Sequence, residues 1–176
     1  MNRPRFAFLA AMILVAALSR LLPHPPNVTP LAAMALFGGA YFADRRLAFL
    51  VPLAALLLSD LILGLHGQML GVYAGFALVV CVGFGLRGRT RALPVAVAAL
   101  IGSSVFFLVS NFGVWATGSW YPKTAAGLGA CYAAAIPFFR NSVAGDLFYT
   151  ALLFGIFALA EKRFTLLREP LPAGAA

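Results

Sequence analysis

Three charged side chains interrupt or border the apolar runs of this sequence and are the first candidates for chemistry. Asp60 and Asp146 fall inside or at the start of apolar runs, and Arg140 is the cation that we expect to pair with one of them. A charge within an apolar segment is costly to bury and usually marks a functional group or an internal ion pair. The sequence therefore predicts either a binding site or an ion pair that holds helix ends together, and it leaves both interpretations open.

Most other polar and amphipathic side chains lie in stretches that a helical bundle would bring to one end. Amides, aromatic rings and a few charges at the mouth of an apolar bundle suit the capture of a water-soluble organic molecule. The residues are His24, Asn27, Thr29, His66, Gln68, Asn111, Trp115, Trp120, Tyr121 and Asn141.

Motifs for catalysis, nucleotide binding and metal binding are missing from the sequence. There is no nucleophile elbow, no GxxxxGK phosphate loop and no HExxH. His24 and His66 stand far from any second ligand at metal-binding spacing, and Cys81 and Cys131 are too few for a disulfide framework. We expect no intrinsic cofactor and no built-in ATPase.

The composition assigns the chain to a membrane. Of its 176 residues, 62% are hydrophobic and 10% are charged, whereas about a quarter of the residues of a soluble domain are charged. At about 20 apolar residues per crossing, the chain has room for about six or seven helices. No soluble enzyme domain can be appended.

The order of apolar runs predicts an all-α polytopic membrane protein with six transmembrane helices. We expect one domain over residues 1–163 and a disordered cytoplasmic tail over 164–176. Residues 125–139 are semi-apolar and contain Gly127, Gly129 and Pro137, and the loop charges lead us to expect that they form a re-entrant or interfacial segment before the last helix. The six expected helices cover residues 6–22, 31–43, 47–65, 69–86, 92–115 and 143–160.

The positive charges predict the orientation. Cytoplasmic loops accumulate Lys and Arg, so the net charge of +8 reports topology and does not indicate nucleic acid. Six crossings with both termini in the cytoplasm place ten basic residues inside and three outside, whereas a seventh crossing would leave seven against six. The ten are Arg3, Arg5, Arg45, Arg46, Arg87, Arg89, Arg91, Lys162, Arg163 and Arg168, against Arg20, Lys123 and Arg140.

Small residues recur at helical spacing and predict contact faces. Ala7 with Ala11 and Ala35 with Gly39 form small-xxx-small pairs. A longer stripe, which places Cys81 toward the protein interior, consists of Gly71, Ala74, Leu78, Cys81 and Gly85. Each stripe is either ordinary bundle packing or a surface for a partner membrane protein.

Two segments resemble the S-components of energy-coupling-factor (ECF) vitamin transporters. Residues 25–64 combine Pro-Pro-Asn-Val-Thr-Pro, a short helix ending Phe-Gly-Gly, a basic turn and a helix ending Ser-Asp-Leu, and residues 135–141 are similar to the external loop before the family's sixth helix. The resemblance implies a bacterial cytoplasmic membrane protein that binds a vitamin. It also implies that Ala7 and Ala11 meet a coupling subunit that acts with ATPases.

Within that family the chain looks most like the small BtuM-like group, which is implicated in cobalamin uptake. The resemblance implies cobalamin as the bound substrate and Cys81 as a ligand of its cobalt, with Cys131 as second choice. The residues expected to bind the substrate are Asn27, Asp60, Tyr73, Cys81, Trp120, Tyr121, Arg140 and Asn141.

Other functions remain open from the sequence. Cys81 could be catalytic and remove an axial ligand, such as cyanide, from the corrinoid. The chain could instead serve a different vitamin, or it could be a structural membrane protein without a solute.

Overall fold

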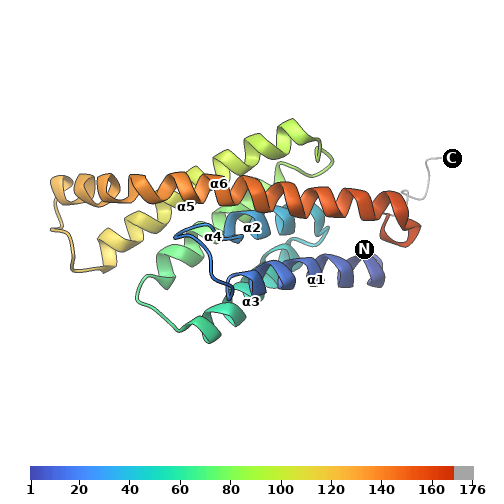
Figure 1. Ribbon diagram of the computed structural model, residues 1–176, viewed down its shortest axis with the longest axis horizontal. Coiled ribbons are helices and arrows are strands. Elements are labelled where there is room, and N and C mark those ends of the chain that lie inside the picture. Colours follow the sequence, from blue (N-terminus) through green and yellow to red (C-terminus); the bar gives the residue numbers. More distant parts are fainter. Residues whose placement is uncertain (169–176) are drawn as a thin grey trace.

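The computed structural model describes residues 1–168, which fold into a bundle of six α-helices and one short 3-10 helix, with no β-strand in that range. The chain winds back and forth along one long axis (Figure 1). The helices are α1 (Arg3–Ser19), α2 (Leu31–Tyr41), α3 (Arg45–Leu63), α4 (Met69–Phe84), α5 (Ala92–Thr117) and α6 (Ala125–Arg163), followed by the 3-10 helix η1 (Thr165–Leu167).

Polar caps set several helix boundaries. The side chains of Asn2, Asp44 and Thr124 accept hydrogen bonds from backbone amides in the first turns of α1, α3 and α6, which satisfies donors that have no partner within the helix. Gly64 ends α3 with a φ of 104°, a conformation that strongly favours glycine. The signals at α1 and α3 explain why these helices begin and end close to the predicted positions, whereas α6 begins at Ala125, well before the predicted residue 143.

The short helix α2 lies at the centre of the bundle, and every one of its residues is buried. Two glycines of α2 allow it to lie very close to α3 and α4. A Cβ atom on Gly39 would lie 2.3 Å from the carbonyl oxygen of Val80 on α4, and one on Gly38 would lie 2.4 Å from a ring carbon of Pro52 on α3. The predicted pair of Ala35 and Gly39 is therefore buried packing within the bundle.

Residues 125–139 form the beginning of α6, so the prediction that they form a segment separate from the last helix is wrong. The helix runs for 39 residues through Pro137, and helices in a membrane tolerate proline where neighbouring helices support them. Its first part packs on α5, where Tyr132 donates a hydrogen bond to the carbonyl of Leu108 at 2.7 Å. The helices α5 and α6 extend beyond the other four at the end away from the termini (Figure 1).

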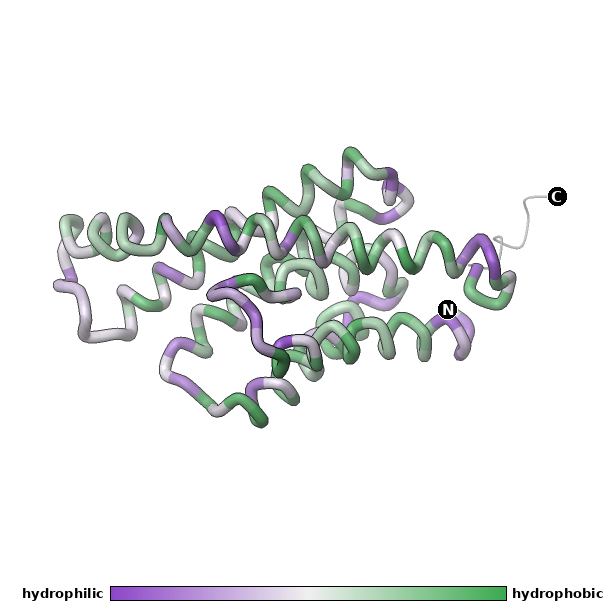
Figure 2. Tube along the Cα trace, in the orientation of Figure 1, coloured by the Kyte–Doolittle hydropathy of each residue, from purple (hydrophilic) through white to green (hydrophobic). Residues whose placement is uncertain are grey.

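The outward faces of the helices are apolar, as expected for a protein surrounded by lipid. The helices α3, α5 and α6 are long and apolar enough to cross a membrane. Leu50, Leu93 and Leu159 are among many large hydrophobic side chains that face outward, and hydrophilic residues are concentrated at the turns and ends (Figure 2). The chain is therefore a helical membrane protein.

Both described ends of the chain lie at the same end of the bundle (Figure 1). The buried guanidinium of Arg5 on α1 pairs with Glu161 on α6 and donates to the carbonyl of Leu167 in η1. Leu167 is buried, and Asn2 donates to the carbonyl of Leu166 at 2.9 Å. Residues 164–168 thus belong to the folded bundle and not to the predicted tail, while 169–176 lie outside the described residues.

The contact face of α4 differs from the predicted stripe. Ala74, Leu78, Cys81 and Gly85 are exposed, and of that stripe only Gly71 is buried. The buried face instead carries Gly71, Gly75, Phe76, Val79, Val80 and Gly83. Gly71 meets Gly113 of α5 so closely that a Cβ on Gly113 would lie 2.7 Å from the Gly71 Cα, and Gly83 meets α2. Backbone contact with two helices therefore decides which face is buried.

Candidate functional site

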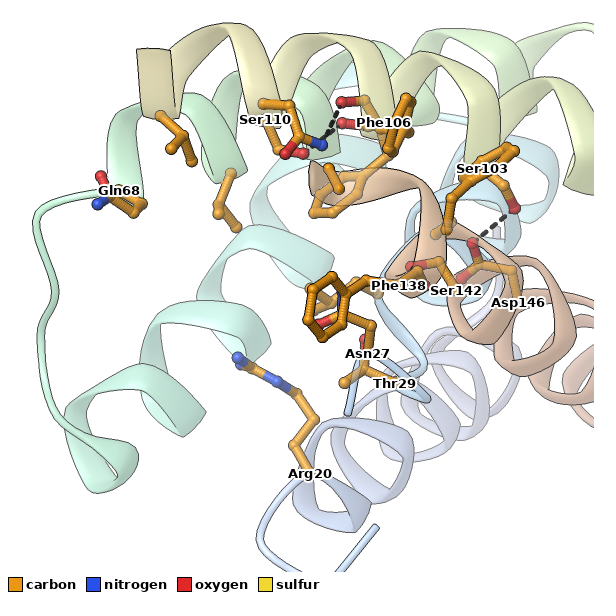
Figure 3. A pocket seen from close by; sticks show the side chains of 18 of the residues that line it. Arg20, Asn27, Thr29, Gln68, Ser103, Phe106, Ser110, Phe138, Ser142 and Asp146 are labelled. Atoms are coloured by element: carbon orange, nitrogen blue, oxygen red, sulfur yellow. Dashed lines mark hydrogen bonds between the residues drawn. The ribbon is translucent and has the colours of Figure 1, made fainter. Parts of the chain in front are cut away.

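A cavity of about 380 Å³ is lined by residues of α5 and α6 and of the loops that precede α2 and α4. These loops lie at the end of the bundle away from the termini (Figure 1). Its size falls at the lower end of the range of small-molecule pockets, about 300–1,000 Å³. Figure 3 shows its main residues. The lining consists of Arg20, Asn27, Thr29, Leu31, Ala32, His66, Gln68, Val72, Ser103, Phe106, Phe107, Ser110, Asn111, Val114, Ala135, Phe138, Phe139, Ser142 and Asp146.

Asp146 and Ser103 form the inner wall of the cavity. The Ser103 hydroxyl donates to Oδ2 of Asp146 at 2.6 Å (Figure 3), and both residues are buried. Ala32, in the first turn of α2, lines the same cavity. Asp146 lies 17 residues before the end of α6, about 25 Å along the helix, which places it deep in the bundle.

Arg20 and Asp60 form an ion pair beside the cavity. An Arg20 Nη1 atom lies 2.7 Å from Oδ1 of Asp60, and the Tyr73 hydroxyl donates to Oδ2 of the same carboxylate at 2.9 Å. Arg20 also donates to the Ser59 hydroxyl. The predicted pairing of Asp60 or Asp146 with Arg140 is wrong, because Arg140 is exposed and makes no ion pair within residues 1–168.

Aromatic rings from α5 and α6 form another part of the lining. The rings of Phe107 and Phe139 are tilted against each other with their centroids 4.6 Å apart. Phe106 and Phe138 line the cavity beside them. Because Phe139, Ser142 and Asp146 are spaced three and four residues apart, one face of α6 presents an aromatic ring, a hydroxyl and a carboxylate in succession.

The loop before α2 is held in place by α6. Asn141 donates a hydrogen bond to the carbonyl of Pro26 at 3.0 Å, and Gly145 lies so close to Val28 that a Cβ would come within 3.0 Å of the Val28 Cα. Asn27 adopts a positive φ of 63°, which asparagine tolerates better than most residues. This anchoring presents Asn27 and Thr29 to the cavity.

The structure brings some of the predicted binding residues to the cavity and leaves others away from it. Asn27 lines the cavity directly. Asp60 pairs with the lining residue Arg20, and Tyr73 donates a hydrogen bond to Asp60. Asn141 holds the loop that carries Asn27. Outside the cavity lie Trp120, which is 73% exposed, Tyr121 and Arg140.

Neither cysteine lines the cavity. Cys81 is exposed on the outer face of α4, so the expectation that it faces the bundle interior is wrong. Cys131 is buried between α5 and α6, with its sulfur 3.5 Å from the carbonyl oxygen of Asn111. No group of three His, Cys, Asp or Glu side chains within residues 1–168 could hold a metal ion.

Several lining residues were not among the predicted substrate-binding residues. Arg20 lies near the end of the first expected helix, residues 6–22, and no local signal distinguishes it from an arginine that only reports topology. Ser103 lies within a long apolar run, where the rarity of hydroxyl groups is the signal that could have identified it, and Ser142 directly follows the predicted residues Arg140 and Asn141. Phe106, Phe107, Phe138 and Phe139 are indistinguishable in sequence from lipid-facing residues, since the chain has 16 phenylalanines.

Comparison with known proteins places the chain in one family. Residues 1–170 match a family of unknown function (DUF6580), and the chain belongs to that family. No curated protein and no solved structure matches it.

Proposed function

We propose that this member of the DUF6580 family is a multi-pass uptake protein that captures a vitamin-sized organic solute outside the cell and carries it across the membrane. The observation that carries the proposal is the cavity of about 380 Å³. Its lining combines hydroxyl, amide, aromatic and charged groups in a protein whose outward faces are apolar. This combination of a concave apolar site with a few convergent polar groups is typical of small-molecule binding.

In the proposed topology all six helices cross the membrane and both termini are cytoplasmic. The position of the basic residues supports this topology. Most of them lie at the end of the bundle that carries the termini: at the N-terminus, in the α2–α3 and α4–α5 turns and at the end of α6. Positive charge concentrates on the cytoplasmic side. The cavity then opens to the outside, and the resemblance to S-components favours the cytoplasmic membrane of a bacterium.

The cavity volume favours a solute smaller than a corrinoid. A cavity near the lower limit of about 300 Å³ for drug-sized ligands accommodates a molecule of one or two rings. Cobalamin is the alternative ligand, and it would require the overhanging parts of α5 and α6 to move away from the loops. Cys81, which faces outward from α4, takes no part in the proposed binding step.

The energy for uptake comes in this proposal from a partner, because the sequence has no nucleotide-binding motif. Ala7 and Ala11 are exposed on α1, and small residues on an outward helix face allow close approach of another membrane helix. Together with the family resemblance, this favours docking of an ECF-type coupling subunit on α1.

Equilibrium binding by the purified full-length protein tests the proposal. The panel contains cobalamin and a set of one- and two-ring vitamins, with Ser142→Trp as the variant that fills the cavity. Leu159→Trp is the matched control, since Leu159 lies on the same helix, is 67% exposed and faces outward. We expect one solute to bind to wild type and to Leu159→Trp but not to Ser142→Trp. A flat response to every solute would overturn the proposal.

A further inference from the structure

The cavity is lined by one carboxylate, that of Asp146, which makes no ion pair within residues 1–168, and this indicates a class of ligand. We propose that the cavity binds an organic cation, in which an amine or quaternary ammonium group is attached to an aromatic or similarly flat body. This inference rests on the proposed function and specifies its substrate class.

The charges around the cavity come from a few elements and leave one negative charge uncompensated. The end of α1 supplies Arg20, α3 supplies Asp60 and α6 supplies Asp146. Arg20 is neutralised by Asp60 at 2.7 Å. Asp146 makes no ion pair with any residue between 1 and 168, so a ligand with one positive charge would complete the balance.

The contacts of Asp146 within residues 1–168 supply no counter-charge. Ser103, a neutral hydroxyl, donates one hydrogen bond to the carboxylate at 2.6 Å. Asp146 is only 5% exposed, and a buried charge without a full counter-charge is unfavourable. A cation in the cavity would remove that cost.

The remaining lining suits an organic cation better than a metal ion. A hard cation such as Ca²⁺ takes about six to eight oxygen ligands, and no cluster of three His, Cys, Asp or Glu side chains exists within the described chain. Phe106, Phe107, Phe138 and Phe139 line the same space. Aromatic faces attract organic cations through their quadrupoles and also bury the apolar body of the ligand.

Anions and zwitterions fit less well. The guanidinium of Arg20 is already engaged with Asp60 and Ser59. A ligand carboxylate would therefore have to compete with Asp60 for Arg20, and an anion would be repelled by Asp146.

A series of probes with one aromatic body and different charges tests the substrate class. The probes are 2-phenylethylammonium, neutral 2-phenylethanol, zwitterionic phenylalanine and anionic 3-phenylpropionate, measured by equilibrium binding to the full chain. The test variant is Asp146→Asn, which keeps the acceptor for Ser103 and removes the charge. The matched control is Asp44→Asn, because Asp44 caps α3 at the opposite end of the bundle. Thermal unfolding verifies that both variants are folded.

We expect wild type and Asp44→Asn to bind the cation at least tenfold more tightly than 2-phenylethanol, and Asp146→Asn to lose this preference. The cation assignment would be overturned if the neutral, zwitterionic or anionic probe bound more tightly than the cation, or if no probe bound. It would also be overturned if Asp146→Asn kept the preference for the cation. If a neutral or anionic vitamin binds to wild type but not to Ser142→Trp, the proposed function stands and only the cation assignment fails. If neither the vitamins nor the probes bind, both proposals fail.

Discussion

The two ends of the bundle are hollowed in different ways. The cavity end is lined by amides, hydroxyl groups, phenylalanines and the buried carboxylate of Asp146. The end that carries the termini has a hollow of about 430 Å³ lined by Arg5, Arg87, Thr90 and Glu161. There Arg5 pairs with Glu161, and Arg87 donates to the carbonyl of Phe42 at 2.7 Å. One hollow therefore offers groups to a ligand, whereas the charged groups of the other hold the protein together.

The central helix α2 separates the two hollows. Its first residues, Leu31 and Ala32, line the cavity. Its last residues, Ala40 and Tyr41, line the hollow at the end that carries the termini. Phe37 and Tyr41 of α2 pack with Phe154 and Phe157 of α6, with ring centroids 4.5 to 5.4 Å apart for the tightest contacts. The helix α2 and this aromatic cluster therefore fill the space between the two hollows, and under the proposed function they are the barrier that a solute would have to pass.

The largest effect is expected from removing the aromatic barrier. Phe37→Ala deletes a fully buried ring that contacts Tyr41, Phe154 and Phe157, and a buried Phe→Ala change costs about 3–5 kcal/mol. We expect the free energy of unfolding in detergent to fall by about 4 kcal/mol. Phe148→Ala is the control, because Phe148 faces outward from α6 and should change stability by less than about 1 kcal/mol. Equal losses from both variants would show that α2 is not a packed barrier.

A smaller effect is expected at the cavity end when the ion pair is broken. Asp60→Asn leaves the mostly buried Arg20 without its counter-charge, and loss of one partner of a buried pair costs about 3 kcal/mol. Adding Arg20→Gln should restore part of that stability, because the orphaned charge is then removed. Unfolding curves of the two single variants and the double variant measure the coupling. If the stability losses of the two single variants simply add up in the double variant, the ion pair between Arg20 and Asp60 does not stabilise the cavity end.

The third effect concerns the close approach of α2 and α4. In Gly83→Ala the new methyl group would lie 2.6 Å from the carbonyl oxygen of Leu36, and overpacking of this kind costs about 2 kcal/mol. Gly155→Ala is the matched control on α6, since nothing lies within 4 Å of a Cβ at that position and alanine favours a helix by about 1 kcal/mol. The melting temperature should fall for the first variant and hold or rise for the second. Equal behaviour would contradict the contact.

The helices could be predicted from the sequence because their ends carry strong local signals. Asp44 with Arg45, the arginines before Ala92 and the glycine at position 64 interrupt apolar runs at the observed boundaries. The beginning of α6 was missed because glycine and Pro137 weaken the local helix signal, and packing on α5 outweighs that preference.

The candidate site was predictable only in its location. The polar residues do lie around one end, but their partners depend on packing between distant segments. Asp60 pairs with Arg20 because α1 packs on α3, which no local pattern reveals. The buried face of α4 was also predicted wrongly. In the sequence, Gly75 with Gly83 is as plausible a helical face as Ala74 with Cys81. Only contact with α2 and α5 shows which face is buried.

The central claim is that a solute-binding cavity opens on the side of the membrane opposite the termini. It is tested most directly by cysteine labelling of intact cells in a Cys81→Ser, Cys131→Ala background. Ser142→Cys places a thiol in the cavity, and Thr90→Cys places one in the hollow at the end with the termini. A membrane-impermeant maleimide added outside should modify the first, with protection by a bound solute, and should reach the second only after permeabilisation. Labelling of both positions from outside, or of Thr90→Cys alone, would contradict the account.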